Sequence, residues 1–523
     1  MTTDRLSDEA TSALGVSGIQ DTTQDTMVER LAVGAAISLI GKVIGRGLDF
    51  AKQVALARML SVEAFGLYAL IWNLLRVAGI LAPLGLQNGV IQFATPFRQT
   101  DKGKFKDVIL RSLALCLVVS IGISIALWFS APWLGRKLFD DPGFVTTFRI
   151  FVWVLPAMVG LRVAANASRI SQRMQYAIYA EELMQAISAL LIFLVLFVAG
   201  WGLYGAVWAT IISFVLAFAL SCYYLYRLFP HAFRAKRRLA VSNYEMLAYS
   251  LPTAFSGMFG VVVNRLDRLF IGYYGSVADV GIYQAAAQFS ITFAIVLEGF
   301  NAVFSPITAE LYHKGHFKEL EEIFRISTKW SIYINIPMFL VIFVAPHSVM
   351  EGIFGAPYLL GVTPLLILTV GQTVNIAVGG VGRLLILTGK QNAWFFTTTF
   401  VMGLSMVLNL VLIPQWGIVG AATATATSIS VLYLIGLFQV RSLLGLWPYD
   451  ARYVKGALAT GVTVGGLLVM RAFLHPAPLL DILLTALVSS GLFFGTLLLI
   501  GLDEEDRRFF RHLYVRVTEK RKR

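Results

Sequence analysis

The chain has little charge for its size and almost no cysteine. Charged residues make up 14% of its 523 positions and hydrophobic residues 57%, and the mean hydropathy is +0.73. This composition excludes an ordinary soluble globular protein. Both cysteines, Cys116 and Cys222, fall inside apolar segments. A disulfide framework and a zinc site are therefore not expected.

Several other signals are missing. No Gly-x-x-x-x-Gly-Lys-Ser/Thr stretch occurs, and no extramembrane region is large enough for a nucleotide-binding domain. We therefore expect no cofactor, no metal and no catalytic activity, and an energy source such as an ion gradient. Residues 1–30 are polar and rather acidic, which is the wrong polarity for a cleavable signal peptide. We interpret them as a disordered cytoplasmic tail.

Long apolar stretches are what the chain has in abundance. Stretches of about 20 residues recur from residue 31 to residue 500, and each is long enough to cross roughly 30 Å of hydrocarbon. Backbone polar groups in lipid must be satisfied internally, so these segments should be helices. The sequence predicts an all-α polytopic membrane protein with about 14 transmembrane helices.

Lysine and arginine set the orientation. The formal charge is +13, and the excess lies in short loops between apolar segments, which argues against a nucleic-acid partner. Loops on one side hold nearly all of these cations, whereas the alternate loops hold only Arg136 and Lys137. This asymmetry places the basic side in the cytoplasm. We expect a multi-pass plasma (inner) membrane protein with both termini cytoplasmic.

The chain also repeats itself. Residues 201–213 and 416–428 are identical at seven of thirteen positions, and the same offset of 215 aligns residues 61–68 with 276–283. Two halves of six spans with the same orientation imply a parallel repeat about an axis along the membrane normal. The expected organisation is a tail 1–30, a first lobe 31–227, a basic linker 228–246, a second lobe 247–441, two added helices 453–500 and a basic tail 501–523.

Ionisable groups inside the spans are the candidate site, because charge in a membrane is costly and usually functional. Cations outnumber carboxylates there, and guanidinium groups bind phosphate oxygens bidentately. We therefore expect the first, second and seventh spans to line a cationic cavity that takes an anionic, pyrophosphate-like ligand. The substrate-binding candidates are Lys42, Arg46, Lys52, Arg76, Arg265 and Arg268. The candidates for ion coupling or charge pairing are Asp49, Asp267 and Glu298.

A purely structural interpretation of the same residues stays open. Asp49 can pair with Arg46 or Lys52, and Asp267 with Arg265 or Arg268. Other cations near span ends, Arg58, Arg162 and Arg383 among them, can extend to an interface.

Three groups of residues resemble the polysaccharide-transporter branch of the multidrug/oligosaccharidyl-lipid/polysaccharide exporter superfamily. They are residues 57–68 with 84–86, residues 267–272 with 280–283, and residues 387–391 with 408–425. The resemblance implies a flippase for a polyprenyl-pyrophosphate-linked oligosaccharide, such as an O-antigen, capsule or exopolysaccharide unit of lipopolysaccharide or polysaccharide biosynthesis. It also implies two six-helix lobes around a cationic cavity, and partner polymerases and glycosyltransferases.

Other functions stay open at this point. An ion-coupled multidrug or metabolite exporter of the same superfamily would prefer a carboxylate-lined cavity, and sodium or protons are the ions to consider. The peptidoglycan-precursor lipid flippases look similar and also have two extra spans. A membrane glycosyltransferase or polymerase would need larger extramembrane loops than the one near 131–147. A scaffold without transport would not need the intramembrane charges.

Overall fold

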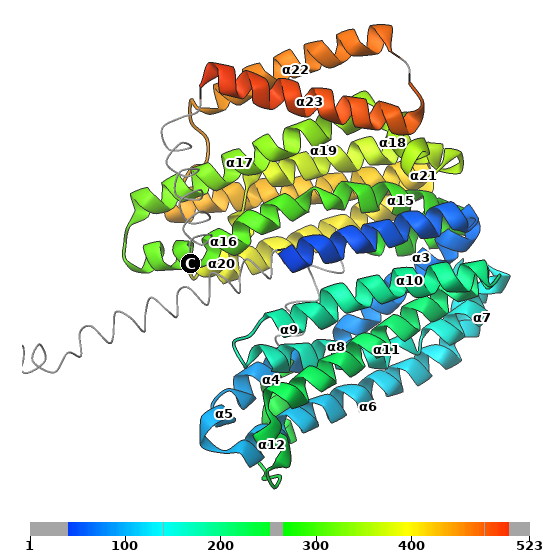
Figure 1. Cartoon of the computed structure of the whole chain (residues 1–523), viewed down its shortest axis with the longest axis vertical. Helices are drawn as coiled ribbons and strands as arrows, with labels where there is room; N and C mark the ends of the chain where they lie inside the picture. The colour runs from blue at the N-terminus through cyan, green and yellow to red at the C-terminus, as the bar shows by residue number, and fades with distance from the viewer. Residues whose placement is uncertain (1–39, 140, 252–264, 475, 502–523) are drawn as a thin grey trace, which may run out of the picture.

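The computed structural model describes residues 40–139, 141–251, 265–474 and 476–501, and this part of the chain contains helices and no strands. The tail 1–30, the segment after 501 and Asn264 lie outside the described residues. Two helical bundles follow one another along the chain, and a hairpin of two further helices follows them (Figure 1). Ten described helical stretches are long and apolar enough to cross a bilayer. The protein is an all-α, multi-pass membrane protein.

The first half begins with a helix over residues 40–59. The elements that follow are α3 Val62–Leu81, α4 Leu86–Ala94, α5 Phe97–Thr100, α6 Lys102–Leu134, η1 Gly135–Phe139, α7 Pro142–Phe151, α8 Val154–Arg169, α9 Gln175–Ile178, η2 Tyr179–Met184, α10 Gln185–Val198, α11 Gly202–Leu228 and α12 Pro230–Arg234. Here η1 and η2 are π-helical.

The second half begins with helical residues 243–251. The elements that follow are α14 Leu266–Tyr274, α15 Val277–Thr292, α16 Ala294–His313, α17 Phe317–Val344, α18 Pro346–Ile353, η3 Ala356–Gly361, α19 Val362–Val378, α20 Val381–Leu387 and α21 Gln391–Leu444. The closing hairpin consists of α22 Tyr453–Phe473 and α23 Pro478–Ile500.

Ten described stretches do not by themselves test the expected number of fourteen spans. The helix α21 has 54 residues but contains a non-helical residue, Gly417, so two expected spans follow one another within it. The expected eighth span is divided between α15 and α16, which are separated at Phe293. The expected seventh span, 247–273, includes residues outside the described ranges. The number fourteen and the exact lobe boundaries therefore stay predictions.

The internal repeat has a structural basis in two glycines. Gly202 and Gly417 occupy equivalent positions of the repeat, and their φ angles are +48° and +54°. This left-handed region is readily adopted only by glycine. Each glycine therefore marks the sharp turn at which an equivalent helix begins, namely α11 in the first half and residues 418–444 of α21 in the second.

The second repeated segment starts a helix in each half. Ser61 caps α3, because its hydroxyl accepts a hydrogen bond from the Ala64 N–H at 3.2 Å. Ser276 does the same for Asp279 at 3.1 Å, and the Asp279 carboxylate accepts the Ser276 N–H at 2.9 Å. These bonds satisfy N–H groups that a helix start leaves without intrahelical partners.

The two halves contact each other backbone to backbone at a pair of equivalent glycines. Gly66 of α3 lies against the carbonyl of Val277 and the backbone of Gly281 in α15. A methyl group on Gly281 would lie 2.6 Å from the Val62 carbonyl oxygen. The largest buried apolar cluster surrounds this crossing and includes Phe65 and Tyr358. In Figure 1 the bundles approach each other where α3 meets α15 and diverge toward the opposite end.

The closing hairpin packs on the second half, over α17 and α18 (Figure 1). Asp481 of α23 is 2% exposed, and it pairs with Arg471 of α22 at 2.7 Å and accepts a hydrogen bond from Ser348 of α18. Ser489 donates to the Pro337 carbonyl of α17 at 3.3 Å. The hairpin is therefore fixed to the bundle by polar contacts as well as by apolar area.

The basic segment between the halves is fastened to α6. The buried carboxylate of Asp107 binds Arg237 at 2.6 Å and Arg111 at 3.1 Å, and it also accepts the Ala240 N–H at 3.2 Å. Arg111 in turn donates to the Val241 carbonyl at 2.8 Å. The linker therefore continues the first half up to the start of the next helix.

The close contact at Gly66 predicts that a single added methyl group destabilises the fold. Gly66→Ala should lower the unfolding free energy by about 1–3 kcal/mol, because the added carbon overlaps backbone atoms of α15 that cannot rotate away. Thermal unfolding in detergent, followed by tryptophan fluorescence, measures this change. Gly122→Ala is the matched control, since nothing lies within 4 Å of that position in α6. Equal melting temperatures for both variants would contradict this account of the crossing.

Candidate functional site

Two equivalent tyrosine–threonine pairs lie beside the crossing. The hydroxyls of Tyr68 and Thr210 are 2.9 Å apart, and those of Tyr283 and Thr425 are 3.4 Å apart. Both pairs are related by the offset of 215 and both are buried. Each pair connects the helix that starts at the repeated serine with the helix that starts at the repeated glycine. The repeat therefore extends from the backbone to a specific hydrogen bond.

Asp267 is a fully occupied carboxylate. It is 1% exposed, and one oxygen accepts the backbone N–H and the guanidinium of Arg268, each at 2.8 Å. The other oxygen accepts from Tyr283 at 2.6 Å and from Thr425 at 3.1 Å. Of the two partners that the sequence offered, the structure selects Arg268. A buried charge with this many donors is held in place by its hydrogen bonds.

The equivalent position in the first half has the opposite charge. Lys52 aligns with Asp267, is 2% exposed and pairs with Asp49 at 2.7 Å. This was one of the two pairings that the sequence left open for Asp49. Lys52 and Arg268 are thus both buried and both paired with a carboxylate.

A chain of amides joins the halves next to these pairs. Arg265 donates to the side-chain oxygen of Asn73 at 2.6 Å, and Arg268 donates to that of Gln284 at 3.0 Å. The Asn73 amide also approaches Gln284, at 3.4 Å. Asn73 lies on α3 and Gln284 on α15, so the chain runs across the glycine crossing. The sequence analysis missed both amides, although polar side chains inside apolar spans were a usable signal.

Arg76 and Arg265 carry charge that no ion pair neutralises among the described residues. Arg76 stacks over the Trp72 ring, with 4.8 Å to its centroid, and Arg265 bonds to the neutral amide of Asn73. Each guanidinium lies within electrostatic range of the other and of Asp49. Four cations, Lys52 and Arg268 included, therefore share two carboxylates. The junction between the halves has a surplus of positive charge.

Arg46 joins the halves nearer to the basic ends of the helices. Its guanidinium is 2.8 Å from the Glu298 carboxylate of α16, and the two side chains are 39% and 53% exposed. Lys42, one turn earlier on the same helix, is exposed and has no ion-pair partner among the described residues. These three groups are accessible, in contrast to the buried pairs.

A π-helix with two carboxylates lies against this part of the first helix. Gly45 packs on the backbone of Glu182, and Gly41 packs on Ile178. Glu181 pairs with Arg169 at 2.6 Å, whereas Glu182 lies in the electrostatic range of Arg46. Short π-helical turns occur often at functional sites. The sequence analysis missed both glutamates, although two adjacent acids at the start of an apolar span could have indicated them.

Two further cations, Arg58 and Arg162, donate hydrogen bonds to backbone carbonyls. Arg58 donates to the carbonyls of Glu351 and Gly352, and to that of Ile353 at 2.9 Å, so it caps the end of α18. Arg162 donates to the Gly79 carbonyl at 3.1 Å.

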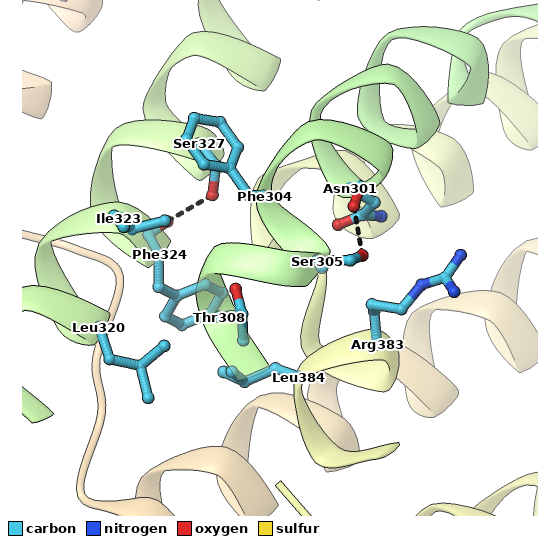
Figure 2. A pocket seen from close by; sticks show the side chains of 11 residues that line it. Asn301, Phe304, Ser305, Thr308, Leu320, Ile323, Phe324, Ser327, Arg383 and Leu384 are labelled. Carbon is cyan, nitrogen blue, oxygen red and sulfur yellow. Dashed lines mark hydrogen bonds between the residues drawn. The ribbon is translucent and has the colours of Figure 1, made fainter. Parts of the chain in front are cut away.

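Arg383 lies at the edge of a small cavity inside the second half, between α16, α17 and α20. Figure 2 shows its side chain directed away from Leu320 and Phe324. This cavity also contains Ser305 and Ser327 and is separate from the junction of the halves. No group of three or more metal-ligating side chains occurs among the described residues.

Comparison with known proteins places the chain among transport-related membrane proteins. A family model described as polysaccharide biosynthesis protein matches residues 55–363. A probable low-salt glycan biosynthesis flippase of Haloferax volcanii is 26% identical over 190 residues, which is 36% of this chain and 40% of that protein. A succinoglycan biosynthesis transport protein of Rhizobium meliloti is 24% identical over 330 residues, covering 61% and 62% of the two chains. The matches therefore span less than two thirds of these relatives.

Solved structures show the same fold. The lipid II flippase MurJ in an inward closed conformation superposes with a TM-score of 0.69 at 14% identity, covering 88% of this chain and all of that one. A multidrug resistance transporter of the MATE family in an inward-facing conformation gives 0.62 at 16% identity, covering 79% and 98%.

The Asp267–Arg268 ion pair should contribute much more to the unfolding free energy than the Arg46–Glu298 ion pair does. Asp267→Asn should cost about 3–5 kcal/mol of unfolding free energy, because Arg268 would remain buried without its charge partner. Glu298→Gln should cost at most about 1 kcal/mol, because that pair is largely exposed. Chemical unfolding in detergent compares the two variants directly. A double variant, Asp267→Asn with Arg268→Gln, should recover part of the loss, and no recovery would contradict the pairing as its cause.

Proposed function

The chain belongs to the polysaccharide biosynthesis protein family, and from this premise we propose that it is a flippase for a polyprenyl-pyrophosphate-linked oligosaccharide. The observation that supports the proposal most is the uncompensated pair Arg76 and Arg265 at the junction of the halves. Two planar guanidinium groups match the oxygens of a pyrophosphate bidentately. The names of the relatives in glycan and succinoglycan biosynthesis agree with such a substrate.

In this proposal the junction residues have different tasks. Arg76 and Arg265 contact the pyrophosphate, and Lys42 and Arg46 attract it from the basic side of the protein. Lys52, Arg268, Asp49 and Asp267 do not contact substrate, because their buried pairs hold the two guanidinium groups in position. A carrier that only moves a lipid-linked passenger needs no catalytic group, so we propose that the protein is not an enzyme.

The proposed orientation follows the charges. We place the protein in the plasma membrane with its basic loops in the cytoplasm. Both termini are then cytoplasmic. Contacts between the halves at Arg58, Gly66 and Tyr358 then lie on the outer side. This arrangement supports entry of the substrate from the cytoplasmic side and exit after the lobes rock about the α3–α15 crossing. A polymerase on the outer side and glycosyltransferases on the inner side are the proposed partners.

Glu298 provides a link between binding and rocking. It holds Arg46 across the halves in the absence of substrate, and a pyrophosphate would compete for the same guanidinium. Substrate binding then removes a connection between the halves on the cytoplasmic side. The sequence does not identify a coupling ion. Asp267 is an unfavourable candidate, because all its acceptor positions are occupied by donors of the protein.

The first functional prediction concerns the guanidinium pair. Arg76→Gln and Arg265→Gln should each weaken binding of undecaprenyl pyrophosphate by roughly tenfold or more, since a charged hydrogen bond is worth about 1.5–3 kcal/mol. Arg76→Lys should retain part of the affinity, because charge remains and bidentate geometry is lost. Tryptophan fluorescence titration measures binding, and quenching of a labelled lipid-linked oligosaccharide in proteoliposomes measures flipping.

Arg136→Gln, which removes an exposed cation of η1 outside the proposed guanidinium pair, is the matched control. Wild-type binding and flipping by both junction variants would refute the proposed site. Transport of a cationic compound, abolished by Glu298→Gln but not by Arg265→Gln, would instead indicate the exporter alternative.

The second functional prediction is a variant that binds the substrate more tightly. Glu298→Gln frees Arg46 from its partner and should increase affinity for undecaprenyl pyrophosphate by up to about fivefold, because an exposed ion pair is worth about 0.2–1 kcal/mol. Arg46→Gln should decrease the affinity. The same titration distinguishes the two outcomes. Weaker binding by Glu298→Gln would show that the carboxylate supports binding and does not compete with it.

A further inference from the structure

A second cationic site lies on the membrane-facing side of the first half, away from the junction. A groove between α6, α7 and α11 is lined by Trp128, Trp153 and Trp208, together with Thr146 and Arg149. The helix α6 lies on the side of the first bundle that faces away from the second bundle (Figure 1). Trp153 and Trp208 are 45% and 39% exposed. The groove is therefore open to the surrounding bilayer.

The guanidinium of Arg149 is fixed in this groove without a carboxylate. It stacks over the Trp128 ring, with 4.2 Å to the centroid, and its Nε donates to the Trp128 carbonyl at 3.4 Å. No ion-pair partner for Arg149 occurs among the described residues. The acid at the start of the same helix, Asp141, accepts the Phe144 N–H instead. The terminal nitrogens of Arg149 therefore present donors to whatever fills the groove.

The distance of the groove from the helix ends indicates which layer of the bilayer surrounds it. Arg149 lies seven residues after the first residue of α7, and Trp208 lies six residues after that of α11. At 1.5 Å per residue, both are about 9–10 Å from the ends of their helices that lie opposite the basic loops. Tryptophan rings favour this boundary between headgroups and acyl chains. The long side chain of an arginine there can place its guanidinium at the level of the lipid phosphates.

We propose that this groove binds the phosphate of an anionic phospholipid, in the leaflet opposite the basic loops. The guanidinium of Arg149 contacts the phosphate oxygens, the Thr146 hydroxyl is a further donor, and the tryptophan rings pack against the glycerol and the first methylenes. Charge complementarity supports this occupant, because a lone cation in an aromatic groove at headgroup depth is stabilised by an anion. The site depends on the protein spanning a bilayer and not on what it transports.

Native mass spectrometry of the detergent-purified full chain tests the site. The probes are dioleoylphosphatidylglycerol and dioleoylglycerol, which share acyl chains but differ in the phosphate. The wild type should retain one more phosphatidylglycerol than Arg149→Gln at equal collision energy, with about tenfold weaker binding in the variant. Dioleoylglycerol should show no difference between the two proteins. Arg149→Lys should give an intermediate result.

Arg136→Gln removes an exposed cation at the same end of the first half and should keep the wild-type number of lipids. Trp153→Leu should weaken retention while leaving the phosphate selectivity. Three results would overturn the proposal: equal phosphatidylglycerol retention by Arg149→Gln, equal loss in Arg136→Gln, or a change of oligomeric state in Arg149→Gln, since a second copy would then be the occupant. Melting temperatures of all variants near that of the wild type show that retention reports binding and not unfolding.

Discussion

The close approach of Gly66 and Gly281 is the constraint on which the arrangement of the two halves depends. Two helices can touch backbone to backbone only where neither carries a side chain, and here the two contacting residues are equivalent in the repeat. The contact therefore lies close to the axis that relates the halves. A contact on such an axis can stay in place while the bundles rotate, because displacement is smallest there. The Tyr68–Thr210 hydrogen bond connects the helices on one side of the crossing, and the Asp267 carboxylate, which accepts from both Tyr283 and Thr425, connects them on the other.

The polar junction next to this crossing follows from the cost of charge in an apolar interior. Two ion pairs with buried cations, Lys52 with Asp49 and Arg268 with Asp267, satisfy their own charges and fix the geometry. The amides of Asn73 and Gln284 then connect the guanidinium groups without neutralising them. An amide is suited to this purpose because it orients a cation while leaving its charge available to a ligand.

Much of the fold was predictable from the sequence, and the site only in part. The length of the apolar stretches predicted the helices, and the identities between residues 201–213 and 416–428 predicted the repeat. The positive φ angles of Gly202 and Gly417 explain why two of these positions are glycine in both copies. The pairing of Asp49 with Lys52 and of Asp267 with Arg268 was among the alternatives that helical spacing left open. Partners across the halves, such as Glu298 for Arg46, were not predictable, because spacing along one helix carries no information about a helix far along the chain. Lys52, Arg268 and Arg76 could not be distinguished in the sequence, and the structure separates them by the burial and the carboxylate partners of Lys52 and Arg268.

The structural residues at the crossing are duplicated in the two halves, whereas the charged residues are not. The glycines, the capping serines and the tyrosine–threonine pairs are all duplicated, and they form the framework that the two halves have in common. The uncompensated cations are not duplicated: the repeat partner of Arg76 is Ile291, and that of Arg265 is Phe50. Even the equivalent buried positions carry opposite charges, with Lys52 in the first half and Asp267 in the second. A passenger with one charged headgroup at the end of one lipid chain has no twofold symmetry. For the proposed passenger, a single, asymmetric pair of guanidinium groups at a symmetric crossing is better suited than two equal sites, because only one headgroup must be held.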